Sequence, residues 1–174
     1  MKNVTSLLMC ILLMWACTQS KIETTSQSPP APTEFADSTY TIIGQEGLRQ
    51  LAEGNVDGFV SHFADNVVFR WNNLDSIAGK QAVTEYWKDR RSNLIDTLSY
   101  EPEIWLGVKA NQPQKGVEPG VYLFNWIKVD VKYVNGKSVN MWIHHVYHFN
   151  DAKKIDVVNQ FLDRAPINAA LAKK

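Results

Sequence analysis

The spacing of apolar residues changes along the chain, from a helical period in its first half to a strand alternation in its second half. Three segments carry apolar side chains every three or four residues and predict helices over residues 40–51, 55–63 and 79–93. Gly54 stands where a helix C-cap glycine is expected, and Asn55 can cap the second helix.

The second half of the chain has the pattern of successive strands. β-Branched and aromatic residues predict strands over residues 67–71, 98–108, 121–133, 139–149 and 155–162. Asn135-Gly136 is a strong hairpin signal, and Asn150-Asp151 marks the following turn. Helices grouped first and antiparallel strands last indicate an α+β fold. We expect one domain over residues 37–163 and then a tail or short helix over 164–174.

The N-terminus has the pattern of an export signal. Residues 4–15 are almost wholly apolar, which is the length of a signal-peptide core and too short to span a bilayer comfortably. The segment ends at Met14-Trp15-Ala16-Cys17, which resembles a bacterial lipobox, although Leu is usual at Met14 and a small residue at Trp15. We predict a signal peptide over residues 1–17 and lipidation of Cys17; the alternative is an ordinary signal peptide with an incidental cysteine.

The segment after Cys17 is rich in Ser, Thr, Gln and Pro. It offers too little apolar surface to offset the entropy of ordering it, so residues 18–36 are predicted to be a flexible tether. Lipid, tether and domain together predict a protein of the bacterial envelope, held at a membrane through Cys17 and facing the periplasm or the exterior. Without lipidation, the same signal predicts secretion.

Charge and composition narrow the function classes. The chain has 18 basic and 18 acidic side chains, so it lacks the positive footprint of a nucleic-acid-binding protein. Six tryptophans, six tyrosines and seven phenylalanines provide enough aromatic bulk for a sizeable core or a lined pocket.

Three segments carry a resemblance to a known superfamily: EGNVDGFVSHFADNVVFRW, GKQAVTEYW and VYHFNDAKKIDVVNQFLD. They resemble the nuclear transport factor 2-like superfamily, which includes SnoaL-like polyketide cyclases, ketosteroid isomerase, limonene epoxide hydrolase and scytalone dehydratase. The resemblance covers roughly residues 40–163. It implies a cone: a curved antiparallel sheet wrapped around the N-terminal helices, with an apolar pocket at its mouth. Relatives commonly form homodimers through the sheet. The activity is not implied, because enzymes and non-enzymes share this fold.

Three of the four histidines lie in the strand segment WIHHVYHF, residues 142–149. Because side chains alternate between faces, His145 points opposite to His144 and His148. The latter two stand about 13 Å apart at roughly 3.3 Å per residue, too far for one metal ion to reach both at about 2.1 Å. No metal site is predicted from this strand, although spacing alone leaves open a site shared by several elements. No cofactor is predicted.

The role of His145 has two interpretations. Compared with ketosteroid isomerase, His145 falls where that enzyme keeps an oxyanion-binding aspartic acid, which implies that it faces the pocket with Ile143 and Tyr147. An imidazole can donate or accept a proton near neutral pH, so His145 is a candidate acid–base catalyst. The alternative is a hydrogen-bonded wall of the pocket.

The other catalytic groups of these relatives are missing. The phenolic donor and the base of ketosteroid isomerase would fall at Gly47 and Trp71, and the base of limonene epoxide hydrolase would fall at Gln160. None of these side chains can accept a proton from a substrate at neutral pH.

The expected pocket is aromatic with a few polar groups, which suits a small and partly apolar ligand. Its predicted members are Trp71, Tyr86, Ile143, His145, Tyr147, Val158 and Gln160, with Phe59 and Phe63 more simply explained as core. We therefore predict an envelope-anchored binding domain without the catalytic residues of its enzyme relatives. The alternative is an enzyme for proton transfer, hydration or cyclisation that uses His145 as acid and base.

Overall fold

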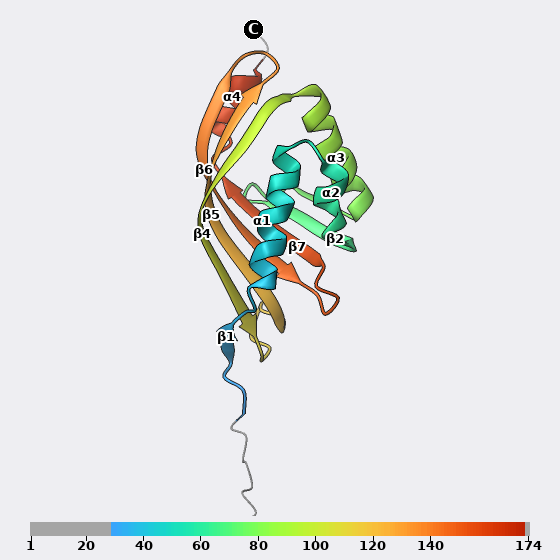
Figure 1. Ribbon diagram of the computed structural model, residues 1–174, viewed down its shortest axis with the longest axis vertical. Coiled ribbons are helices and arrows are strands. Elements are labelled where there is room, and N and C mark those ends of the chain that lie inside the picture. Colours follow the sequence, from blue (N-terminus) through green and yellow to red (C-terminus); the bar gives the residue numbers. More distant parts are fainter. Residues whose placement is uncertain (1–28, 173–174) are drawn as a thin grey trace, which may run out of the picture.

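A strongly curved sheet forms one side of the molecule, and α1 and α3 lie against its concave face with α2 between them (Figure 1). The computed structural model describes residues 29–172. The strands are β1 (Thr33–Phe35), β2 (Phe63–Trp71), β3 (Ser76–Ala78), β4 (Ile95–Ala110), β5 (Gly120–Tyr133), β6 (Ser138–Phe149) and β7 (Ile155–Leu162). The helices are α1 (Thr39–Ala52), α2 (Val56–Ser61), α3 (Lys80–Asn93) and α4 (Ala165–Leu171).

The sheet is mixed, with the strand order β1-β4-β5-β6-β7-β2-β3. Every neighbouring pair is antiparallel except β2 and β7, which run parallel. The α+β class and the curved sheet are confirmed, but the expectation of a purely antiparallel sheet is wrong at this one pair. The chain leaves β2, passes through β3, α3 and three long strands, and only then returns beside β2, so no short-range signal reports the pairing.

The element boundaries differ from prediction at the sheet edges. Thr33–Phe35 pairs with β4, so the segment expected as a tether over 18–36 ends in a short strand. The other edge strand, β3, has no counterpart among the predicted elements. Both strands have three residues, too few to show an alternation. β2 begins at Phe63 instead of residue 67, since Phe63 already pairs with Ile155 of β7, and the register then shifts before Val68.

The β5–β6 hairpin forms at the predicted Asn-Gly turn. Gly136 has a φ of +82°, a conformation that glycine adopts without strain. The Lys137 backbone N–H donates to Asn135 Oδ1 over 3.0 Å. This turn sets the register of β6, in which Val139, Met141, Ile143, His145, Tyr147 and Phe149 all face the interior.

α1 approaches the sheet at a glycine. A Cβ on Gly44 would stand 2.6 Å from Leu123 Cδ2 and 2.7 Å from Trp105 Cζ3, closer than real Cβ contacts. Gly47 is also buried in α1, but its Cβ would meet only Phe59 and His62 at 3.6 Å, an ordinary contact.

We expect the same substitution to have different effects on stability at the two glycines. Gly44→Ala should lower the free energy of unfolding by about 1–3 kcal/mol, because it overpacks the helix–sheet contact. Gly47→Ala should leave stability unchanged or raise it by up to about 1 kcal/mol, because alanine favours the helix. Urea unfolding of both variants checks this pair. Equal effects of the two changes would contradict the close approach of α1 at Gly44.

Candidate functional site

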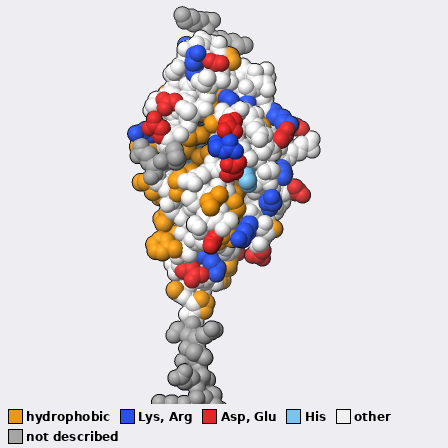
Figure 2. Space-filling view, viewed as in Figure 1, with side chains coloured by type: hydrophobic (Ala, Val, Ile, Leu, Met, Phe, Trp, Pro, Cys, Tyr) orange, Lys and Arg blue, Asp and Glu red, His pale blue; other side chains and the backbone are white. Residues whose placement is uncertain are grey.

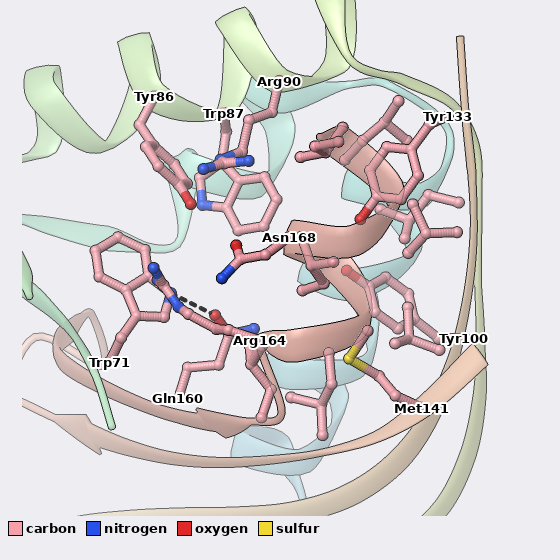
Figure 3. A pocket seen from close by; sticks show the side chains of 18 residues that line it. Trp71, Tyr86, Trp87, Arg90, Tyr100, Tyr133, Met141, Gln160, Arg164 and Asn168 are labelled. Atoms are coloured by element: carbon pink, nitrogen blue, oxygen red, sulfur yellow. Dashed lines mark hydrogen bonds between the residues drawn. The ribbon is translucent and has the colours of Figure 1, made fainter. Parts of the chain in front are cut away.

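A cavity of about 140 Å³ lies between the concave sheet, α3 and α4 (Figure 3). α4 covers it, and Ile167, Asn168 and Leu171 contribute to its lining. The β5–β6 turn holds this helix in place: Asn135 Nδ2 donates to the Ala170 carbonyl over 2.9 Å, and Lys137 Nζ donates to the Ala169 carbonyl over 3.1 Å. These bonds satisfy carbonyls that a helix C-terminus otherwise leaves unpaired.

Aromatic rings from β2 and α3 form one wall of the cavity. The ring centroids of Trp71 and Tyr86 are 5.2 Å apart, and those of Tyr86 and Trp87 are 5.4 Å apart in an edge-to-face arrangement. The opposite wall comes from β4, β5 and β6 and combines apolar side chains with two tyrosines. They are Ile95, Leu98, Val129, Val131, Met141 and Ile143, together with Tyr100 and Tyr133.

A chain of polar side chains runs behind the cavity. Trp71 Nε1 donates to Gln160 Oε1 over 2.7 Å, and Gln160 Nε2 lies 3.0 Å from His145 Nε2. His145 Nδ1 lies 2.9 Å from Asn125 Oδ1, which also accepts from the His145 backbone N–H. Because the amide oxygen of Gln160 accepts the hydrogen bond from the indole N–H, its amide nitrogen donates to His145 Nε2. The imidazole therefore carries its hydrogen on Nδ1, and this N–H donates to Asn125 Oδ1.

This arrangement makes His145 a poor proton acceptor. Burial, with a smaller contribution from His144, lowers the pKa of His145 to about 3. At neutral pH the ring is therefore neutral, and both of its nitrogens already have partners.

The predicted faces of β6 are confirmed: His145 is interior, whereas His144 and His148 lie on the convex face. His145 does not line the cavity, because Gln160 stands between them.

The structure brings together four of the predicted pocket residues on the cavity wall: Trp71, Tyr86, Ile143 and Gln160. The other predicted residues are buried but lie outside its lining: His145, Tyr147, Val158, Phe59 and Phe63. Phe59 and Phe63 pack on each other with centroids 4.8 Å apart, in agreement with their interpretation as core.

Two arginines at the cavity were missed by the sequence analysis. Arg90 places its guanidinium carbon 4.3 Å from the centroid of the Tyr86 ring, and Arg164 places its own 5.4 Å from the Trp71 ring. Burial raises the pKa of Tyr86, whereas both guanidiniums act to lower it. A signal for Arg90 exists in the sequence, since it falls seven residues after Val83, on the apolar stripe of α3.

The convex face of the sheet carries an aromatic cluster. Trp126 stacks on His144 with centroids 4.5 Å apart, and His144 stacks on Phe161 at 5.6 Å. Trp142 beside them is 51% exposed. The expected homodimer through the sheet stays a prediction, which sedimentation of the domain in solution would check.

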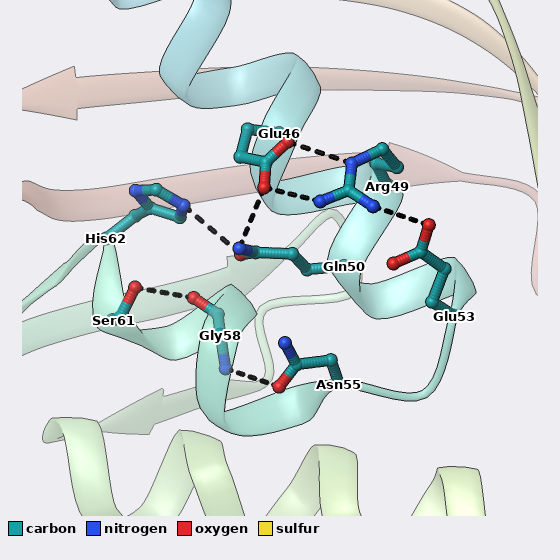
Figure 4. A network of polar contacts seen from close by, with 8 residues as sticks. All are labelled: Glu46, Arg49, Gln50, Glu53, Asn55, Gly58, Ser61 and His62. Atoms are coloured by element: carbon teal, nitrogen blue, oxygen red, sulfur yellow. Dashed lines mark hydrogen bonds and ion pairs between the residues drawn. The ribbon is translucent and has the colours of Figure 1, made fainter.

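A second polar cluster joins α1 to α2 (Figure 4). Arg49 pairs with Glu46 at 2.6 Å, and His62 Nε2 lies 3.2 Å from Gln50 Oε1. Asn55 caps α2 as predicted, accepting from the Gly58 N–H. The side chains of Arg49 and Glu46 are 53% and 37% exposed. We therefore interpret the cluster as a contact between two helices and not as a ligand site.

Apolar side chains also gather beside α1 in the space-filling view (Figure 2). There a groove between α1 and β4 is lined by Leu48, Leu98 and Trp105 among others. Among the side chains that the structure describes, no three of His, Cys, Asp or Glu come together as metal ligands do. In the same part of the chain, no helix has the length and apolarity that crossing a membrane requires.

Comparison with known proteins identifies the fold's relatives. Residues 45–157 match the family described as the SnoaL-like domain. An NTF2-like protein of unknown function from Burkholderia pseudomallei superposes with a TM-score of 0.64 at 14% identity, covering 79% of this chain and 100% of that one. A limonene-epoxide-hydrolase-like enzyme of M. tuberculosis gives 0.60 at 10% identity, covering 77% and 90%.

A third structure, the epoxide hydrolase/cyclase-like SalBIII of salinomycin pyran-ring formation, gives a TM-score of 0.57 at 20% identity, covering 72% of this chain and 92% of that one. No curated protein matches the sequence. At these identities the structures support the fold, not an activity.

The buried neutral imidazole predicts an acid-sensitive contribution to stability. The pKa of His145 rises from about 3 in the folded protein to its ordinary value of 6.5 on unfolding, so the unfolded chain binds more protons as the pH falls. Between about pH 7 and about pH 5 this should cost about 2 kcal/mol of unfolding free energy. Over the same pH interval, the His145→Gln variant should lose about 2 kcal/mol less unfolding free energy than the unchanged protein, as measured by urea unfolding. An identical pH dependence of the two proteins would contradict the buried neutral state.

Proposed function

We propose that this chain, which belongs to the SnoaL-like domain family, is a binding domain whose cavity holds a small, partly apolar molecule. The observation that carries the proposal is the composition of the cavity: apolar side chains and aromatic rings form most of its lining, with a few polar groups. Such a lining retains an apolar body and orients it through a small number of hydrogen bonds. A dry cavity of roughly 150 Å³ is known to hold a benzene ring, so the volume of about 140 Å³ suits a one-ring compound.

Binding is better supported than catalysis because a base is missing from the lining. Among the described residues around the cavity there is no Asp, Glu or His. The positions at which ketosteroid isomerase keeps its donor and base correspond to Gly47 and Trp71. Gly47 is packed in α1, and Trp71 donates its only polar hydrogen to Gln160. Proton transfer needs a group that can accept the proton within hydrogen-bond reach of the substrate.

The alternative, an enzyme with His145 as acid and base, is less well supported. His145 is separated from the cavity by Gln160 and has a pKa of about 3. Accepting a proton there at neutral pH would create a buried cation without a carboxylate partner. The epoxide hydrolase activity named for one related structure belongs to that protein, which is 10% identical to this chain.

We also propose that the domain is anchored in the bacterial envelope through a lipid on Cys17. Cys17 and the whole predicted signal lie outside the described residues, so the support is the lipobox-like sequence and the polar segment after it. In Figure 1, β1 lies at the end of the molecule opposite α4. A tether that enters at β1 would point the covered mouth of the cavity away from the membrane.

Filling the cavity should weaken the binding of a neutral one-ring compound. Leu98→Trp places an indole in the cavity, and we expect benzyl alcohol to bind at least about tenfold more weakly to it than to the unchanged protein, because the ligand and the indole compete for the same volume. Leu106→Trp is the matched control, since Leu106 lies on the same strand but is partly exposed outside the cavity. Saturation-transfer NMR measures the binding. Equal binding by both variants would contradict the assignment of the cavity.

Lipidation should depend on one of the two cysteines. In cells fed an alkyne analogue of palmitate, the unchanged protein and Cys10→Ser should carry the label, because Cys10 lies inside the predicted signal. Cys17→Ser should lose the label and the preference for the detergent phase in a detergent extraction, because stable anchoring requires the acyl chains. Label retained on Cys17→Ser would contradict the anchor.

A further inference from the structure

Two positive charges lie at the mouth of the cavity, and the described residues that line it supply no negative charge. Arg90 from α3 and Arg164 at the start of α4 are both half-buried there, and no described lining residue is acidic. Figure 3 shows the two guanidiniums near Tyr86 and Trp71, on the side of the cavity opposite Tyr100, Tyr133 and Met141. The electrostatic effect of both arginines on Tyr86 shows that their fields act on the same region.

Neither arginine is fully neutralised by the protein. Arg164 has one carboxylate partner, Asp75, at 3.5 Å, and the Asp75 side chain is 63% exposed to solvent. Arg90 has no carboxylate within 4.0 Å in the described part of the chain, and it lies over the neutral ring of Tyr86. A hydrogen bond from Arg90 also acts to lower the pKa of the Tyr86 phenol, whereas the buried Nε of Arg90 has no acceptor.

Two hydrogen-bond donors in the same corner lack acceptors, although the lining also holds the amide of Asn168 and the phenolic oxygens of three tyrosines. Arg90 Nε and Trp87 Nε1 are both buried and have no acceptor. Gln160 cannot supply one, because its oxygen already accepts from Trp71 and its nitrogen donates to His145. Buried N–H groups without acceptors cost about 1–3 kcal/mol each, so an acceptor-rich group entering this corner is favoured.

From this geometry we propose that the ligand is a small carboxylic acid in its anionic form, whose ring or branched apolar body occupies the cavity and whose carboxylate meets Arg90 and Arg164 at the mouth. The inference rests on the proposed binding function and adds the chemical class of the ligand. A carboxylate brings acceptors only, and a guanidinium can bind it with two parallel hydrogen bonds. A group of larger size, such as an extended polycyclic acid, exceeds a cavity of about 140 Å³ with α4 in place.

Phenylacetate and phenylacetamide test the proposal, because they share shape and differ in charge. We expect phenylacetate to bind the unchanged protein at least about tenfold more tightly by isothermal titration calorimetry. Arg90→Met should reduce phenylacetate binding by about tenfold and leave phenylacetamide binding within about twofold, since it removes a charge and keeps the apolar stem. Arg70→Met is the control for net charge, because Arg70 is exposed on β2 away from the cavity, and it should change neither affinity.

The other outcomes distinguish a failure of the carboxylate inference from a failure of the proposed binding function. If phenylacetamide binds as tightly as phenylacetate, or if Arg70→Met weakens phenylacetate as much as Arg90→Met does, the carboxylate inference is wrong and the binding cavity stands. If benzyl alcohol binds but neither phenylacetate nor phenylacetamide does, the ligand class is also wrong. If none of the three compounds binds, or if Leu98→Trp leaves their binding intact, the proposed function itself fails.

Discussion

The interior of this protein depends on one row of directly opposed residues that crosses four adjacent strands. Asn125 pairs with His145, His145 with Gln160, and Gln160 with Trp71, so every hydrogen bond of the polar chain joins neighbours in the sheet register. A slip of β6 by one residue would turn its apolar side chains to the convex face, and the slip that brings Val146 into this row would break the chain at both ends. The polar groups left unpaired in the interior would each cost about 1–3 kcal/mol. These hydrogen bonds form in the observed register, and they therefore favour it over the alternatives.

The row continues into β4 and there meets the helical layer. Trp105 pairs with Asn125 in the register of β4 and β5, and its ring lies under Gly44 of α1. The missing side chain of Gly44 lets α1 sit close to the sheet at this point. α3 and α4 cover the other end of the concave face, where the cavity remains between them and the strands. The contact at Gly44 thus sets the distance between α1 and the sheet at one end of the concave face, and the cavity lies at the other end.

Local patterns predicted most of the fold, and long-range pairing explains what they missed. The hairpin at Asn135-Gly136 and the alternation in β6 put His145 opposite His144 and His148, because both depend on neighbours in sequence, and the resemblance to ketosteroid isomerase indicated that His145 is the interior one. Its partner Asn125 could not be found in the same way, since the pairing depends on the register between two strands. Arg164 approaches Trp71 only because α4 folds back over the mouth. A sequence pattern contains no information about that contact, whereas the place of Arg90 on the apolar stripe of α3 was visible.

The arginines and the missing base can be understood as one constraint. A carboxylate base in this cavity would lie close to Arg90 and Arg164, and nearby positive charges lower the pKa of a carboxyl group. A carboxylate held in that way is a weak base, because its ionised form is stabilised. An imidazole in the same place would be disfavoured in its protonated form by the same charges, and His145 already needs about 5 kcal/mol to become protonated at neutral pH. A mouth with two guanidiniums therefore suits an anion better than a carboxylate or imidazole base, in keeping with the proposed ligand.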